Sequence, residues 1–195
     1  MVKTSDQESA GLVPLAPEFA NGQLDPLSTH GAWGEGLVRL ARDDYSGAAE
    51  HFQRAIDLEG YWVGHYELAW ALSAQEDHVR ALQEIERALS DSTGALAQEF
   101  GLESTAAAFQ ALAGDSAGAR ARLEGLDATT ESAFAMGLAR AALGEVEQAF
   151  ELWLNQTDWT ILLPTHFRYG PMLDGIRGHP RYQDVLESID EQWGW

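Results

Sequence analysis

Histidines and carboxylates are the side chains of this sequence that could carry acid–base or metal chemistry. The six histidines are His30, His51, His65, His78, His166 and His179. No two of them stand three or four residues apart, the spacing at which one helix face presents two metal ligands, and no HExxH motif occurs. We therefore expect no metal site.

Motifs of nucleophilic and cofactor-dependent enzymes are missing as well. The sequence has no GxSxG elbow, no phosphate-binding loop and no dinucleotide fingerprint. It has no cysteine, which excludes disulfides and a cysteine nucleophile. We expect no catalytic residue, no cofactor and no enzymatic activity. The enzyme alternative would need a polar cleft that holds an acid or a histidine with a strongly shifted pKa.

The charge balance of the chain bears on its partners. Its 195 residues include 31 acidic and 12 basic ones, a formal net charge of −19. Phosphate backbones would be repelled, so we expect no nucleic-acid partner. Residues 1–21 contain no apolar run long enough for a signal peptide, and no segment is long and apolar enough for a membrane span. These absences predict a cytoplasmic protein without membrane contact.

Four of the carboxylates recur in a fixed pattern, which indicates the elements that carry them. Each acid is followed four residues later by alanine and, in the next turn, by a large apolar residue. Another small residue stands twelve positions before each alanine. Two antiparallel helices can approach closely at such small residues, and the acid suits the start of the second helix. The four sets are Gly36, Asp44, Ala48, Phe52; Ala69, Asp77, Ala81, Ile85; Ala107, Asp115, Ala119, Leu123; and Gly137, Glu145, Ala149, Trp153.

Copies spaced 30 to 38 residues apart predict an all-α array of helical hairpins. The pattern resembles the tetratricopeptide repeat over residues 32–155. The matching residues are Gly36, Tyr45, Ala48, Phe52, Ala55 and Leu58 in the first unit, and Leu68, Ala69, Ala81, Ile85 and Ala88 in the second. The usual closing proline is replaced by Gly60, the early tryptophan is displaced to Trp33, and the unit lengths vary. The resemblance implies a right-handed α-solenoid of four hairpins, closed by a C-terminal capping helix.

The chain divides into three expected parts. Residues 1–28 form an N-terminal segment that is partly disordered or extended along the first helices, and residues 29–156 form the repeat array. Expected helices are 32–42, 46–58, 61–75, 78–89, 95–113, a short one ending near 125, 131–143 and 145–155, with Thr129 or Thr130 capping the seventh. Residues 157–195 form the expected C-terminal capping segment. In it, residues 173–182 resemble the terminal segment of many bacterial tetratricopeptide proteins, in which a Leu-Arg pair precedes an Asp-Pro-Arg-Phe box; here His179 replaces the acid and Tyr182 the phenylalanine. The resemblance implies that this segment caps the last hairpin. Residues 159–163 fit either a strand or a helical turn.

The resemblance also implies a partner-binding groove lined by the first helix of each hairpin. The matching positions are Trp33, Leu37, Tyr66, Trp70, Phe134 and Leu138. An aromatic floor ringed by acids would suit a protein or peptide segment that is apolar and flanked by Arg or Lys. Leu37 and Trp70 replace the asparagines of carboxylate-clamp members, so that specificity is not expected.

Two alternatives to an open groove remain. The chain's own ends could fill the groove, in which case its aromatic residues belong to the core. The terminal segment also resembles those of arrays that regulate transcription or signalling, so the chain could act as a regulatory subunit beside a separate effector chain.

Overall fold

The structure is a computed structural model that describes residues 28–60, 62–92, 94–126, 131–156 and 162–193. Within these ranges every regular element is a helix, which confirms the all-α expectation. The elements are α2 (Thr29–Leu40), α3 (Tyr45–Glu59), α4 (Trp62–Ala74), α5 (His78–Asp91), α6 (Gly94–Glu99), α7 (Leu102–Leu112), α8 (Ser116–Glu124), α9 (Ala133–Ala142), α10 (Val146–Leu154), α11 (Leu162–Tyr169), the 3-10 helix η1 (Pro171–Ile176) and α12 (Pro180–Trp193).

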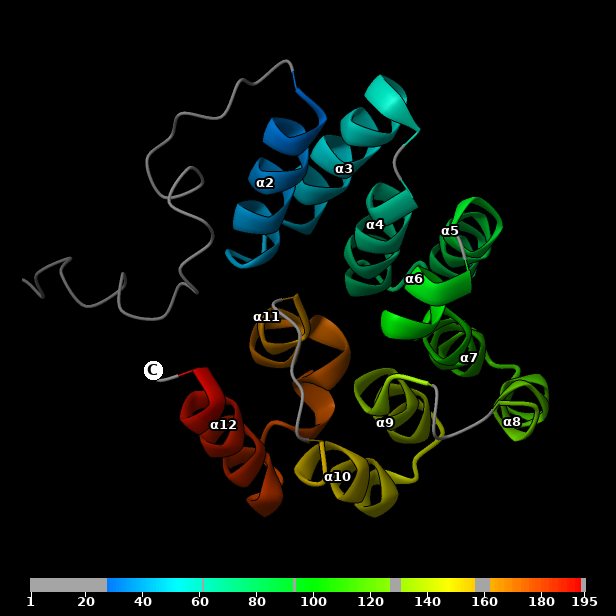
Figure 1. Cartoon of the computed structure of the whole chain (residues 1–195), viewed down its shortest axis with the longest axis vertical. Helices are drawn as coiled ribbons and strands as arrows, with labels where there is room; N and C mark the ends of the chain where they lie inside the picture. The colour runs from blue at the N-terminus through cyan, green and yellow to red at the C-terminus, as the bar shows by residue number, and fades with distance from the viewer. Residues whose placement is uncertain (1–27, 61, 93, 127–130, 157–161, 194–195) are drawn as a thin grey trace, which may run out of the picture.

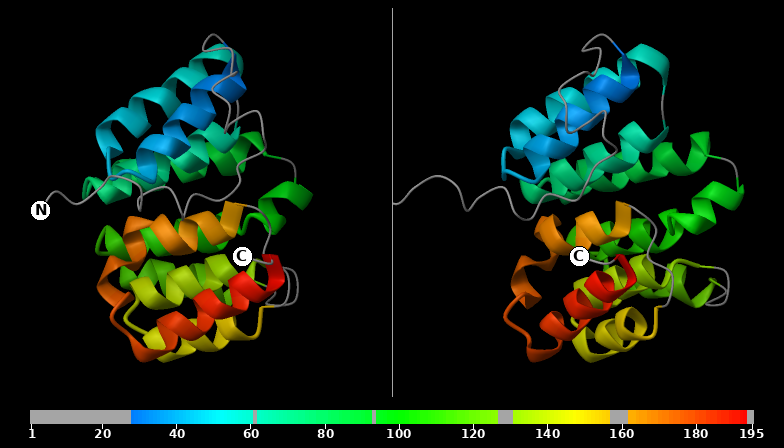
Figure 2. Two further views of the ribbon diagram at one scale, coloured as in Figure 1. Left: turned by 90° about the vertical axis from the view of Figure 1, so that its left-hand side faces the viewer. Right: turned by 60° about the vertical axis from the view of Figure 1, so that its left-hand side comes forward.

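The helices pack in sequential pairs. α2 packs on α3, α4 on α5, α7 on α8 and α9 on α10, and contacts of α3 with α4, α5 with α7 and α7 with α9 join the pairs. The pairs form an arc in which α4, α7 and α9 lie on the inner side and α5 and α8 on the outer side (Figure 1). α11 lies inside this arc, and both views of Figure 2 place it between the upper and lower helices.

All four hairpins turn in the same way. The backbone N–H of the recurring acid donates to the carbonyl five residues earlier: Asp44 to Arg39 at 3.0 Å, Asp77 to Leu72 at 3.0 Å, Asp115 to Gln110 at 3.0 Å and Glu145 to Arg140 at 2.8 Å. The residue before each acid has a left-handed backbone, with φ of 59° at Asp43, 63° at Glu76, 97° at Gly114 and 80° at Gly144. This turn ends one helix and aims the next one back along it.

The recurring acids begin the second helices, as the sequence predicts. The side chains of Asp44, Asp77 and Asp115 accept hydrogen bonds from the backbone N–H groups of Gly47, Arg80 and Gly118. Glu145 makes no such cap. Its carboxylate instead pairs with guanidinium groups of two other helices.

The small residues permit the close approach that their spacing predicts. Ala48, Ala81, Ala119 and Ala149 are fully buried. A Cβ on Gly36 would lie 2.4 Å from the ring of Phe52, and one on Gly137 would lie 2.1 Å from the indole of Trp153. In both hairpins the large side chain therefore fills the space left by glycine.

α4 is the central helix of the arc. Each residue from Val63 to Ser73 is buried, which confirms that this nearly all-apolar segment is covered on more than one side. α3 and α5 flank it, and η1 packs on it from the C-terminal part of the chain.

Two sequence-based boundaries need correction. Residues 95–113 form two helices, because the backbone changes direction at Gly101, where φ is 61°. Gly101 also packs closely on α9, since a Cβ at this position would lie 2.4 Å from the Cβ of Ala135. Ser132 caps α9, not Thr129 or Thr130, which lie outside the described residues. Of the segment 159–163, which fits a strand or a helical turn, residues 159–161 lie outside the described residues and Leu162 begins α11. The N-terminal segment expected over 1–28 lies outside the described residues up to position 27.

Candidate functional site

Five of the six predicted groove residues are enclosed by protein. Tyr66, Trp70 and Phe134 are fully buried, Leu138 is 1% exposed and Leu37 is 3% exposed. Trp33 is half-buried and packs against the same core. At these positions the chain itself therefore fills the inner face. The segment that covers α4 and α9 belongs to the C-terminal part of the chain.

His166 of α11 enters the aromatic floor. Its ring centre lies 4.5 Å from that of Trp70 and 5.5 Å from that of Tyr66. Its Nε2 lies 3.0 Å from Oε2 of Glu67, and both side chains are fully buried. We call Tyr66, Glu67 and Trp70 the His166 socket. Trp70 also stacks on Phe134, with 6.3 Å between ring centres, so the socket contacts α9, another inner helix.

The neighbouring Phe167 binds a second set of side chains. Its ring meets Trp153 of α10 edge-on at 5.1 Å and stacks on Tyr182 of α12 at 4.8 Å. The Tyr182 hydroxyl donates a 2.6 Å hydrogen bond to the Phe167 carbonyl. Burial raises the pKa of Tyr182, although the guanidinium groups of Arg177 and Arg168 oppose the shift. The hydroxyl therefore stays a hydrogen-bond donor at neutral pH.

Arg177 holds the end of α11 in place. Its guanidinium donates to the carbonyl oxygens of Arg168 and Gly170, the latter at 3.2 Å, and to the Tyr182 hydroxyl at 2.8 Å. A cation is favourable at the C-terminal end of a helix, where carbonyl groups are left without partners. Gly170 completes the fit, since a Cβ there would lie 2.8 Å from the Trp70 ring.

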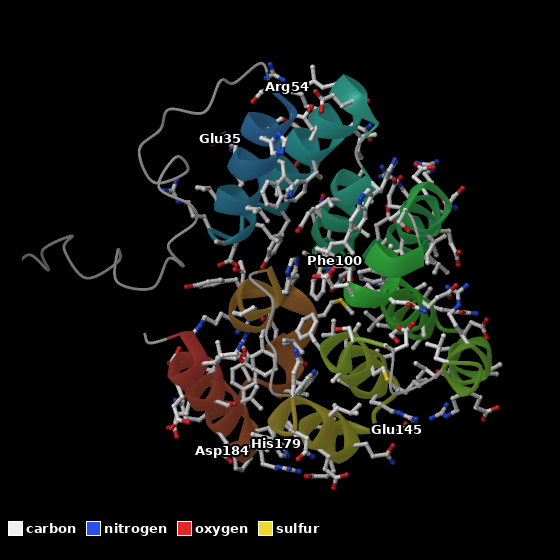
Figure 3. All side chains as sticks on the ribbon, viewed as in Figure 1. Glu35, Arg54, Phe100, Glu145, His179 and Asp184 are labelled. Carbon is white, nitrogen blue, oxygen red and sulfur yellow. The ribbon has the colours of Figure 1, made fainter. Side chains whose placement is uncertain are left out.

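The last helix covers the last hairpin. α12 packs on α10, with Tyr182, Val185 and Ile189 buried and Ile176 and Leu186 half-buried. His179 stacks on Phe150 at 4.4 Å, and its Nε2 lies 3.1 Å from a carboxylate oxygen of Glu147. Figure 3 shows His179 between the ribbons of α10 and α12, with Asp184 at the outer rim.

Sequence reasoning missed the residues that close the inner face, namely Glu67, His166, Phe167 and Arg177. Glu67 carries the one available signal, because it is the only acidic residue of α4, a helix made largely of apolar residues. A buried carboxylate needs a hydrogen-bonding partner, so its presence predicts a polar side chain from another part of the chain. His166 carries no such signal in its own sequence.

A second buried acid–histidine pair lies on the outer side of α4. Nδ1 of His65 is 2.7 Å from Oε2 of Glu84, and Arg87 contacts the other oxygen of that carboxylate at 2.6 Å. Burial would raise the pKa of Glu84, but the His65 hydrogen bond and the Arg87 charge outweigh it and leave the pKa below its usual value. Both carboxylate oxygens are therefore satisfied, which is the behaviour of a structural pair.

The contact closest to a nucleophile–base pair joins Ser73 and His78. The Ser73 hydroxyl lies 3.1 Å from Nδ1 of His78 in a pocket of about 300 Å³, which Tyr45 and Asp174 also line. Burial and the hydrogen bond to Asp43 raise the pKa of Tyr45 to about 12, so its phenol is neutral at pH 7. No carboxylate among the described residues is hydrogen-bonded to His78, so nothing there orients it as a base. The contact spans the turn between α4 and α5.

In the described part of the chain, two further properties bear on function, namely metal binding and membrane insertion. No group of three or more histidine and acidic side chains there is arranged to hold a metal ion. None of its helices combines the length and apolar character needed to cross a membrane. Comparison of the chain with protein-family models, with curated proteins and with solved structures finds no match in any of the three.

Proposed function

We propose that the chain is a tetratricopeptide-like repeat scaffold that binds a protein or peptide partner on its inner face, and that its own α11 holds this face in the absence of the partner. The observation that carries the proposal is the insertion of His166 between Tyr66, Glu67 and Trp70. Docking of a helix into an aromatic groove is a recurring mode of peptide recognition.

The contacts of α11 support exchange with a partner. α11 reaches the array through His166 and Phe167, and Arg177 braces it from within the C-terminal segment. Aromatic side chains in enclosed pockets supply much of the energy of protein interfaces, so the floor that binds α11 could bind an external segment equally well. The large negative charge favours partners with basic flanks.

Binding in trans tests the proposal. The probe is a fluorescein-labelled synthetic peptide with the sequence of residues 162–182, and the proteins are the full chain and its Arg177→Ala variant. The tethered α11 competes at an effective concentration in the millimolar range, so the wild-type chain should bind the peptide weakly. Arg177→Ala removes the brace without touching the His166 socket and should bind at least tenfold more tightly, as measured by fluorescence anisotropy.

A surface substitution provides the control. Arg54 is exposed on α3 (Figure 3). The Arg54→Ala variant should therefore bind the peptide as the wild type does. Hydrogen exchange at residues 162–169 reports whether Arg177→Ala has loosened α11. A variant with fast exchange there and no peptide binding up to about 1 mM would contradict the proposal.

A further inference from the structure

The carboxylate of Glu67 is only half used by the segment that now covers it. Oε2 accepts from His166, whereas Oε1 is buried and has no hydrogen-bond partner among the residues that the structure describes. Glu67 is fully buried on the central helix of the arc. A buried carboxylate oxygen without a donor is costly, so an occupant that supplied a second donor would be favoured.

The geometry of an imidazole explains why His166 serves one oxygen only. Its two ring nitrogens face in different directions, and the one that reaches Glu67 is Nε2. A guanidinium instead presents two parallel N–H groups, spaced to match the two oxygens of a carboxylate. An ammonium is a compact charge and lacks this match.

The walls of the socket suit the same group. The rings of Trp70 and Tyr66 lie 6.2 Å apart at 61°, and both contact the flat imidazole of His166. Planar guanidinium groups stack on such rings and are attracted by their negative faces. An apolar occupant would leave both Glu67 oxygens unsatisfied, and an acidic one would bring a second negative charge to a buried carboxylate.

We infer that the partner segment that replaces α11 presents an arginine to Glu67, with its guanidinium between Trp70 and Tyr66. This inference rests on the proposed function. His166 is then the weaker occupant that the chain supplies itself. Arginine forms two charge-assisted hydrogen bonds where His166 forms one, which gives the partner an advantage that the tethered segment lacks.

A peptide series isolates this contact. Four labelled peptides have the sequence of residues 162–182 and differ only at position 166, which carries arginine, histidine, lysine or citrulline. Citrulline has the shape of arginine without its charge. The Arg177→Ala protein should bind the arginine peptide at least tenfold more tightly than the citrulline peptide. This ratio corresponds to about 1.4 kcal/mol of binding free energy. In the double variant Arg177→Ala/Glu67→Gln the ratio should fall below about threefold.

Equal binding of the arginine and citrulline peptides would overturn the inference, and so would an arginine preference that survives Glu67→Gln. Absence of binding by every peptide would instead contradict the proposed function. In that case two variants of the chain itself test the arginine site. His166→Arg and His166→Met each place one long side chain at the socket, and only the first is charged. His166→Arg should melt at the higher temperature, and the order should reverse on Glu67→Gln. A lower melting temperature for His166→Arg on the Glu67 background refutes the site.

Discussion

The imidazole of His166 and the indole of Trp70 lie with their ring centres 4.5 Å apart, although Trp70 belongs to the second hairpin and His166 to the C-terminal segment. This contact makes Trp70 a core residue. Its ring also meets Phe109 at 6.2 Å and Phe134 at 6.3 Å, and no part of the side chain is exposed. Trp70 therefore contacts the inner helices α7 and α9 and the C-terminal helix α11 through one side chain.

Replacing Trp70 by alanine should destabilise the fold. Loss of a fully buried aromatic ring costs about 3–5 kcal/mol of unfolding free energy, through lost burial and the cavity that remains. Urea unfolding followed by circular dichroism measures the change. Leu58→Ala is the control, because Leu58 is 45% exposed on α3 and its truncation should cost less than about 0.5 kcal/mol. Equal costs for the two variants would contradict the core position of Trp70.

The sequence predicts the hairpins well because their contacts are local. Gly36 and Phe52 meet within one hairpin, and the same small-to-large spacing returns in each copy, so periodicity reveals it. The position of α11 depends on contacts between residues 99 apart, such as Glu67 and His166, which no local pattern encodes. For the same reason Tyr66 and Trp70 can be assigned to the inner face from spacing, but what covers that face cannot.

Gly137 offers a test of the small-residue spacing. Gly137→Ala would place a Cβ 2.1 Å from Nε1 of Trp153, an atom that donates to the Phe134 carbonyl at 3.0 Å. The indole would have to move, and overpacking of this kind costs about 1–3 kcal/mol. Gly178→Ala is the matched control, since its Cβ would meet no atom within 4 Å. Thermal melts of the two variants should separate clearly, and coincident curves would refute the close approach.

The repeated turn predicts a stabilising substitution. Glu76 has a φ of 63° at the position where the third and fourth hairpins have glycine. Because a side chain in the left-handed region costs roughly 1–2 kcal/mol, Glu76→Gly should raise the unfolding free energy by about 1 kcal/mol after the greater flexibility of the unfolded chain is included. Gly144→Ala is the reverse experiment. Its Cβ would meet nothing within 4 Å, so the expected loss reflects backbone strain alone. Guanidinium denaturation measures both variants, and a loss for Glu76→Gly would contradict the argument.

The helix caps predict a dependence of stability on pH. The backbone N–H of Gly118 and then the amide of Gln110 lower the pKa of Asp115 from its usual value. A carboxyl with a lowered folded pKa contributes stability above its unfolded pKa, and this contribution is lost as the pH falls through the folded pKa. Asp115→Asn keeps a capping oxygen without the charge. The unfolding free energy of Asp115→Asn should therefore fall furthest below that of the wild type at pH 7, and the difference should shrink towards pH 2.

Asp184→Asn is the control for the loss of one negative charge, because Asp184 is exposed on α12. Its difference from the wild type should change less between pH 7 and pH 2 than that of Asp115→Asn. Urea unfolding at both pH values gives the comparison. A deficit of Asp115→Asn that grows at low pH would have the wrong sign.

The buried pair of Glu67 and His166 should behave as a coupled unit in a double-mutant cycle. Glu67→Met leaves His166 without its carboxylate, and His166→Leu leaves Glu67 as a buried charge without a donor. Removal of one partner of a buried pair costs about 3–5 kcal/mol, whereas apolar replacement of both partners is often close to neutral. The double variant Glu67→Met/His166→Leu should therefore be more stable than either single variant.

Hydrogen exchange in the single variants should rise first at residues 162–169, because α11 is the element that the pair fastens. Additive losses in the double variant, with uniform exchange along the chain, would show that the two side chains act independently and that α11 is held by Phe167 and Arg177 instead.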